Sequence, residues 1–272
     1  MNSDLSERRL FTNDIDDADL SWSFGQASLR LRCSPNRESG CEDAIAVIPF
    51  GDDGVVLAVA DGVGGSPGGR DAAMIVLEAL RVGIGMAGEG ELQQAIFASI
   101  EAANEQLIEQ RRGSGTTVVI AEIVGGKLRS YHVGDSEIAV VGQRGRIKHR
   151  IVPHSPTGFA VESGLLSEDE AMHHEYRHIL LNVVGAPSMR IEMAAPLELA
   201  ARDTVLLASD GLLDNLYMAE ILEEARCGDL AQTADRLVEF ARERMATNDG
   251  SVPSKPDDLS LVIFRPNART RR

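Results

Sequence analysis

The sequence predicts an α+β fold, a four-layer α-β-β-α sandwich in which two antiparallel sheets pack together and helices cover them on the outside. Two runs of short apolar segments have the length and β-branched content of buried strands, and each run is followed by two segments with helical periodicity. Two runs of strands, each followed by a pair of helices, fit two sheets that pack together with the helices on the outside. A doubly wound sheet would need strict alternation of strand and helix, which the sequence lacks.

The first half of the chain contains one run of strands and two helices. Strands are expected over residues 22–61, with an irregular interruption at 33–41, and residues 62–69 form a glycine-rich loop. A helix follows over residues 70–80. The next helix has the clearest periodicity, because apolar side chains recur on one face at Leu92, Ile96, Ile100, Ala103 and Leu107.

The second half of the chain also contains a run of strands followed by two helices, and it has one insertion. Residues 115–152 are expected to be strands, beginning with a hairpin that turns at Gly125-Gly126. Residues 153–178 are polar, contain four of the six histidines and hold a short helix opened by the capping box Ser167-x-x-Glu170, which indicates a lid insertion. The remaining expected elements are strands at 179–184 and 191–209, helices at 216–226 and 229–246, and a last strand at 259–264.

The composition is that of an acidic globular protein. The chain has 272 residues, and its 27 basic and 42 acidic side chains give a net charge of −15. This charge disfavours nucleic acid and anionic membranes as partners. The three cysteines and the polar N-terminus favour a cytoplasmic protein, which we expect to be monomeric. One domain is expected over residues 21–266, with a polar lead-in over residues 1–20 and a basic tail over residues 267–272.

Three apolar runs end in an aspartate just before a turn, at Asp61, Asp135 and Asp210. A carboxylate at the end of a buried strand is costly to desolvate unless a cation or a hydrogen-bond donor meets it. Hard divalent cations take oxygen ligands, so several such carboxylates indicate a metal site. The alternative for each is an aspartate that caps a turn or a helix.

Six motifs in a fixed order resemble those of the metal-dependent protein phosphatases of type 2C, in their bacterial form. Each motif alone is common, whereas six in this order are specific, and the resemblance extends over residues 23–265. The motifs are Glu42-Asp43-Ala44, Asp61-Gly62-Val63-Gly64-Gly65, Gly115-Thr116-Thr117, Gly134-Asp135-Ser136, Ser209-Asp210-Gly211-Leu212-Leu213-Asp214-Asn215 and Asp257-Asp258-Leu259-Ser260.

The resemblance implies a signalling hydrolase that removes phosphate from phosphoserine and phosphothreonine in a phosphorylated protein. It implies two divalent cations, Mn²⁺ or Mg²⁺, with a bridging hydroxide that attacks phosphorus. Their ligands would be Asp61, the carbonyl group of Gly62, Asp210 and Asp257, and Asp135 would hold a weaker third cation.

Asp257 and Asp258 are adjacent on a segment expected to be extended, so their side chains point to opposite sides and only one can face the metals. The order of the motif favours Asp257 as the ligand.

Five further positions carry expectations from the resemblance. Glu42 and Asp43 match an acidic pair that orders metal-bound water, with a structural role as the alternative. The phosphate-gripping arginine of the family usually stands four residues before this pair, where this chain has Glu38. Arg37, one residue further away, is the candidate phosphate contact if one residue is inserted. Glu137 stands where many relatives carry arginine.

Two other functions are consistent with parts of the sequence. The altered arginine positions suggest a non-catalytic relative that binds a phosphoprotein, although all three main metal aspartates are present. Separately, His174-Glu175-Tyr176-Arg177-His178 satisfies the His-Glu-x-x-His pattern of zinc proteases, in which both histidines lie on one face of a sustained helix. A strand expected directly after His178 makes such a helix short.

Overall fold

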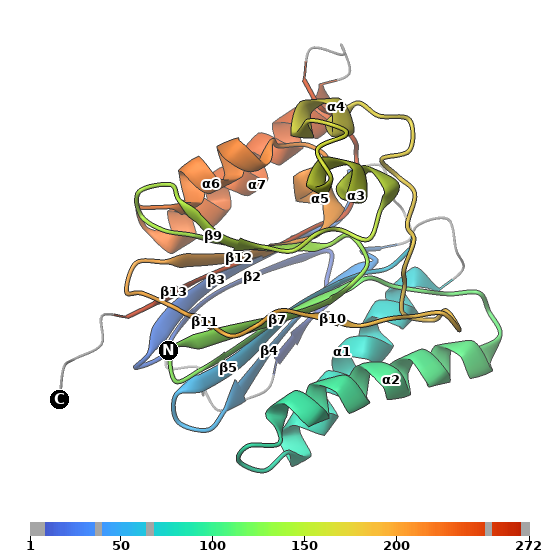
Figure 1. Ribbon diagram of the computed structural model, residues 1–272, viewed down its shortest axis with the longest axis vertical. Coiled ribbons are helices and arrows are strands. Elements are labelled where there is room, and N and C mark those ends of the chain that lie inside the picture. The colour runs from blue at the N-terminus through green and yellow to red at the C-terminus, as the bar shows by residue number, and fades with distance from the viewer. Residues whose placement is uncertain (1–8, 36–39, 64–67, 248–251, 268–272) are drawn as a thin grey trace.

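The computed structural model of the chain describes residues 9–35, 40–63, 68–247 and 252–267, and it confirms the predicted fold (Figure 1). Two antiparallel sheets pack face to face, helices cover the outer face of each sheet, and a separate pair of short helices forms the predicted lid.

The first sheet has the strand order β1-β4-β5-β6-β7-β10, with β11 also paired to β7. The strands are β1 (Arg9–Phe11), β4 (Asp43–Phe50), β5 (Gly54–Asp61), β6 (Val118–Val124), β7 (Lys127–Val133), β10 (Glu192–Met193) and β11 (Leu197–Glu198). Gly125 and Gly126 both have positive φ angles, of 57° and 73°, so the predicted hairpin between β6 and β7 is confirmed.

The second sheet has the strand order β2-β3-β13-β12-β8-β9. Its strands are β2 (Ile15–Ser21), β3 (Gly25–Arg32), β8 (Glu137–Val141), β9 (Ile147–Arg150), β12 (Thr204–Ala208) and β13 (Leu259–Pro266). β12 and β13, which are separated by three helices in the chain, pair at the centre of this sheet.

The helices form two outer layers. α1 (Gly69–Met86) and α2 (Leu92–Gln110) cover the first sheet, and α5 (Asp210–Leu213), α6 (Met218–Ala225) and α7 (Leu230–Ala246) cover the second (Figure 1). The lid contains α3 (Pro156–Glu162) and α4 (Glu168–Met172). α4 begins with the predicted capping box, in which Ser167 Oγ accepts from the Glu170 amide at 3.2 Å and the Ser167 amide donates to the Glu170 carboxylate at 2.8 Å.

The central strand β5 shows why its sequence is apolar without alternation. Val55, Leu57 and Val59 pack between the two sheets, while the residues between them pack beneath α1 and α2. Both faces of the strand are therefore buried, and each valine or leucine removed from water contributes about 1.5–3 kcal/mol. This rigid layer carries Asp61 at its end.

Two segments differ from expectation. Residues 9–20, expected as part of the polar lead-in over residues 1–20, contain β1 and all of β2 except its last residue. The acidic side chains of β2 are compensated by its neighbour β3, because Asp17 contacts Arg32 at 3.0 Å and Asp19 contacts Arg30 at 3.1 Å. The strand expected at 179–184 is reduced to a single bridge between Thr116 and Val184.

The basic tail over residues 268–272 lies outside the described residues. In the described part of the chain, every helix is too short or too polar to cross a membrane.

Candidate metal centre

Acidic side chains from both sheets meet at one end of the sandwich. Asp61 ends β5 and Asp135 follows β7 in the first sheet, while Asp210 follows β12 and Asp257 precedes β13 in the second. Asp61 is close enough to the other three for their charges to raise its pKa, in addition to the larger effect of burial. The structure therefore brings together the aspartates that were predicted from separate strand ends.

Strand register places a second acid beside Asp61. Asp43 at the start of β4 pairs directly with Asp61 at the end of β5. Asp43 is 1% exposed, and burial raises its pKa to about 8 even though a hydrogen bond from Ser209 lowers it. Its Oδ2 accepts from Ser209 Oγ at 2.7 Å, while its buried Oδ1 has no hydrogen-bond partner among the described residues. A buried, unpartnered carboxylate oxygen at this point suits a water or a cation.

The backbone of Asp61 is fixed by the motif Gly115-Thr116-Thr117. The Asp61 carbonyl accepts from the Thr117 amide at 2.8 Å and from Thr116 Oγ1 at 2.7 Å. Thr117 Oγ1 in turn lies 2.7 Å from Ser136 Oγ, next to Asp135. These bonds connect the motifs that carry Thr116, Thr117 and Ser136 to the end of β5, so these small polar residues position Asp61 and the segment that carries Asp135.

The loop after Asp61 approaches the start of α1 so closely that only glycine fits. A Cβ atom on Gly62 would lie 2.4 Å from the Gly69 carbonyl group. The Gly62 amide donates to the Glu42 carbonyl at 3.2 Å. A Cβ atom on Gly69 would lie 3.2 Å from the Glu42 carboxylate, so Glu42 also faces this loop. The role of the Gly62 carbonyl as a ligand stays a prediction.

On the second sheet, Lys255 lies among three carboxylates. Its Nζ hydrogen-bonds to Asp210 and lies 3.0 Å from both Asp214 and Asp257. Burial alone would lower the pKa of Lys255, but the surrounding carboxylates raise it above its usual value. The lysine is thus a charged ammonium within the acidic centre.

Asp258 contacts a different part of the chain from its neighbour Asp257. It is buried, and its two oxygens accept from the amides of Ser34 at 2.6 Å and Glu42 at 2.7 Å. Asp258 therefore positions the segment that carries Glu42, while the neighbouring Asp257 contacts Lys255.

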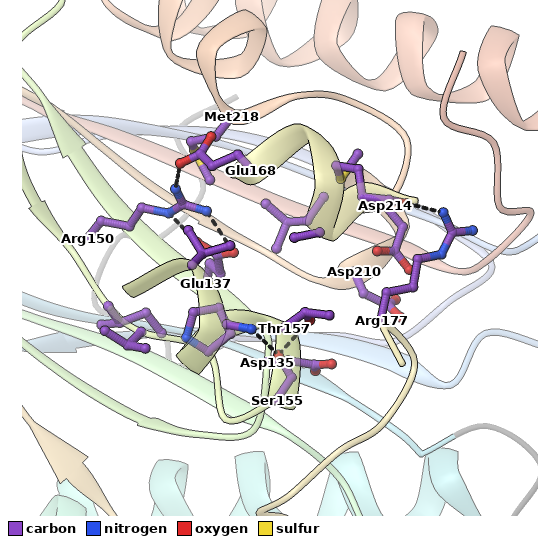
Figure 2. Close-up of a pocket in the computed structure, with 18 of the residues that line it drawn as sticks. Asp135, Glu137, Arg150, Ser155, Thr157, Glu168, Arg177, Asp210, Asp214 and Met218 are labelled. Carbon is purple, nitrogen blue, oxygen red and sulfur yellow. Dashed lines mark hydrogen bonds and ion pairs between the residues drawn. The ribbon is translucent and has the colours of Figure 1, made fainter. Parts of the chain in front are cut away.

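A pocket of about 190 Å³ lies between Asp135 and the lid (Figure 2). Figure 2 shows Asp135, Asp210 and Asp214 on its wall together with Ser155 and Thr157 of the lid. Burial, together with the charges of Asp210 and Asp214, raises the pKa of Asp135 to about 8. A nearby cation would stabilise the ionised form of a carboxyl group in this setting.

The sequence profile of the protein phosphatase 2C family matches residues 35–250. The chain belongs to the protein phosphatase 2C family. The serine/threonine protein phosphatase PstP of Mycobacterium tuberculosis is 28% identical over 214 residues, which are 76% of this chain and 40% of PstP. The chain thus spans less than half the length of this relative. A serine/threonine phosphatase of Listeria welshimeri is 26% identical over 207 residues, 71% of this chain and 81% of that protein.

Solved structures of serine/threonine phosphatases share the fold. The crystal structure of M. tuberculosis PstP superposes with a TM-score of 0.74 at 25% identity, covering 90% of this chain and 99% of PstP as crystallised. The catalytic domain of PstP in complex with two manganese ions gives a TM-score of 0.71 at 24% identity, with the same coverage.

One departure from the protein phosphatase 2C motifs has a local explanation. Glu137, where the resemblance led us to expect arginine, receives two hydrogen bonds from Arg150, at 2.7 and 3.2 Å (Figure 2). Arg150 also contacts Glu168 of the lid. Glu137 is thus neutralised within its own sheet and linked to the lid. The other departure, Glu38 with its neighbour Arg37, lies outside the described residues.

The protease pattern in the lid lacks the geometry that it needs. α4 ends at Met172, so neither His174 nor His178 lies on a helix. The Nδ1 of His174 accepts from the Tyr176 amide at 3.1 Å, while His178 lies 3.9 Å from Asp214. The two histidines therefore do not present one helical face to a zinc ion.

A different group, which sequence reasoning missed, does gather three potential ligands. Ligand atoms of His132, His154 and Glu192 lie within 4.8 Å of one another, the only such group in the described part of the chain. However, His154 Nδ1 accepts from the Gly134 amide at 3.0 Å and faces the Asn182 amide nitrogen at 2.9 Å. The neutral ring then carries its hydrogen on Nε2, which lies 3.1 Å from Glu192, so no lone pair is left there for a metal.

Sequence reasoning also gave no role to Lys255, or to Asp214 and Ser209, although the latter two lie within a quoted motif. Lys255 stands two residues before Asp257, and alternation along an extended segment places both on one side. Asp214 stands four residues after Asp210, one helical turn away. The spacing of Lys255 from Asp257 and of Asp214 from Asp210 could therefore have been recognised in the sequence. The bond from Ser209 to Asp43 joins two sheets and has no local signal.

Proposed function

We propose that this protein is a metal-dependent phosphatase that hydrolyses phosphoserine and phosphothreonine in proteins. The main support is that Asp61, Asp210 and Asp257 lie together at one end of the sandwich, in a chain that belongs to the protein phosphatase 2C family. Relatives over this region are named serine/threonine phosphatases, which supports the same reaction here. The substrate would be a phosphorylated signalling protein in the cytoplasm.

The donor set at this end suits two hard cations. Asp61, the Gly62 carbonyl, Asp210 and Asp257 offer only oxygen ligands, which Mn²⁺ and Mg²⁺ prefer. The PstP catalytic domain is described with two manganese ions, which supports the same number here. Asp135 would serve a weaker third cation. When bound, such cations lower the pKa of a water molecule at the centre and offset charge on the phosphoryl oxygens.

The chain itself contributes orientation and charge. Thr116 and Thr117 hold the end of β5, so that Asp61 is presented from a rigid strand. Ser209 holds one oxygen of Asp43 and leaves the other available to orient a water. Since burial and neighbouring acids raise the pKa of Asp61, its carboxylate is best stabilised when positive charge enters the site.

Substrate choice would depend on the pocket under the lid. Its wall combines the acids of the centre with Arg150 and Arg177 and with apolar side chains such as Val161 and Met218. A peptide side chain next to the phosphorylated residue can lie there while the phosphate occupies the acidic centre. This arrangement suits an extended peptide better than a small phosphate ester.

Phosphate release from a phosphothreonine peptide, with and without Mn²⁺, tests the proposal. We expect activity only with metal, and we expect Asp61→Asn to reduce kcat/KM by at least about 100-fold, since a residue central to catalysis contributes several kcal/mol. Asp71→Asn, at an exposed helix position, is the matched control and should retain activity.

Three results would change the assignment. Metal-independent release that persists in Asp61→Asn would refute the mechanism. Binding of the phosphopeptide without turnover at any metal concentration would indicate the non-catalytic relative. Zinc-dependent peptide cleavage that is lost in His174→Ala would indicate the protease.

A further inference from the structure

Lys255 places a positive charge at the position where the proposed function requires a metal ion. Its ammonium group has three N–H donors, and three carboxylates surround it, from Asp210, Asp214 and Asp257. The side chain is 23% exposed, so this is not a loose pair on the surface. Two of the three partners, Asp210 and Asp257, are the proposed metal ligands of the second sheet.

The backbone around Lys255 is built to keep it there. Asn215 is fully buried, and its Oδ1 accepts from the Lys255 amide at 2.8 Å while its Nδ2 donates to the Lys255 carbonyl at 2.9 Å. The same Nδ2 donates to the Gly211 carbonyl at 2.8 Å, at the start of the helix that carries Asp210. One buried amide thus fixes the lysine relative to the aspartate that it contacts.

An ammonium and a divalent cation cannot both use these oxygens. Hard cations bind carboxylate oxygens at about 2.0–2.6 Å, so an ion on Asp210 and Asp257 would occupy the space that Lys255 Nζ fills at 3.0 Å or less from the same groups. Like charges at such a separation repel. Asp214, which is outside the proposed ligand set, offers the displaced ammonium a remaining partner.

We propose that Lys255 is a tethered cation that competes with the metal ion for Asp210 and Asp257, so that metal binding must displace its ammonium group. The inference rests on the proposed function, because it takes these two carboxylates as metal ligands. Lys255 then lowers the metal affinity of the centre and stabilises the metal-free protein by neutralising part of the acidic cluster.

Calorimetric titration of Mn²⁺ into the EDTA-stripped full-length chain tests the competition. Lys255→Met keeps the length of the side chain and removes its charge, and we expect its Kd for Mn²⁺ to fall about 10-fold, the effect of about 1.4 kcal/mol. Lys148→Met is the control, because Lys148 pairs with Asp203 at 2.6 Å on a strand of the second sheet outside the centre. Its Kd should equal that of the wild type.

Thermal unfolding separates competition from a simple loss of structure. Without metal, Lys255→Met should melt below the wild type, since three carboxylates lose their cation, whereas its stabilisation by Mn²⁺ should be larger. If the variant is poorly folded, Lys255→Gln, which can still donate hydrogen bonds to the carboxylates, replaces it. An unchanged or weaker affinity for Mn²⁺ in a folded variant would overturn the proposal.

Lysine acetylation, read by mass spectrometry, follows the displacement in the wild type. We expect Mg²⁺ to raise the labelling of Lys255 several-fold and to leave Lys127, which is 61% exposed, unchanged. Labelling of Lys255 that does not respond to a bound metal would overturn the proposal. If neither the wild type nor Lys255→Met binds Mn²⁺ or Mg²⁺, the metal-dependent function fails as well, which separates the two failures.

Discussion

Ser209 joins the two sheets directly beneath the acidic centre, and its replacement by alanine tests how much that connection stabilises the protein. Ser209 is fully buried, and its hydroxyl group donates to Asp43 Oδ2 at 2.7 Å and accepts from the Ser260 amide at 2.9 Å. Ser209→Ala leaves both partners buried without this bond, on opposite sides of the interface between the sheets.

The magnitude follows from these two groups. A buried polar group that loses its partner costs about 1–3 kcal/mol, so the variant, which leaves two such groups, should lose about 2–6 kcal/mol of unfolding free energy. At about 2.1 cal/mol/K per residue, the unfolding entropy of a 272-residue chain is about 0.57 kcal/mol/K near 60 °C. The melting temperature should therefore fall by about 4–11 °C.

Scanning calorimetry in EDTA measures this fall without the contribution of bound metal. Ser163→Ala is the matched control, because Ser163 is exposed and its hydroxyl group makes one bond, to the Ala160 carbonyl at 3.1 Å. The control should change the unfolding free energy by at most about 0.5 kcal/mol. A fall in Ser209→Ala no larger than that of the control would refute the reasoning that this hydroxyl group links the sheets.

Three further predictions concern the same end of the molecule. In EDTA the melting temperature should fall as the pH rises from about 6 to about 8. The pKa of Asp43 is about 8 in the folded protein, against an ordinary value of 3.8. The folded state therefore holds a proton that the unfolded state has lost, and the unfolding free energy falls by up to about 1.4 kcal/mol for each pH unit between these two values. A melting temperature that rises with pH would contradict this sign. Arg150→Ala should lower stability by about 3–5 kcal/mol in urea unfolding, since Glu137 stays buried without its partner. Arg150→Lys should recover part of the loss, and equal losses would argue against the ion pair. Gly134→Ala should destabilise more than Gly90→Ala, measured by thermal melting. Both glycines have positive φ, but only at Gly134 would an added methyl group lie 2.6 Å from a neighbouring side chain, whereas the space at Gly90 is open. Similar losses of stability at both positions would contradict the prediction and show that the positive φ angle alone determines the cost.

Local sequence patterns were sufficient for most of the elements. The helix Leu92–Gln110 follows from apolar residues on one face, and the hairpin at Gly125-Gly126 follows from the conformations that glycine allows. The strand Ile15–Ser21 was missed because its aspartates look like solvated charge until Arg30 and Arg32 are placed on the neighbouring strand. Charge compensation between strands depends on pairing, which a local window does not contain.

The sequence by itself determined which residues stand at strand ends, and hence the candidate acids Asp61, Asp135 and Asp210, because the alternation of buried strand and turn is a local property. Only the tertiary structure decided what each acid meets. Antiparallel register set Asp43 opposite Asp61, and sheet packing brought Ser209 to Asp43. These contacts join segments up to 166 residues apart, and their geometry arises from the packing of whole sheets. The position of the Lys255 ammonium group among Asp210, Asp214 and Asp257 belongs to this second category, since the backbone of Lys255 is held by the buried Asn215, forty residues away.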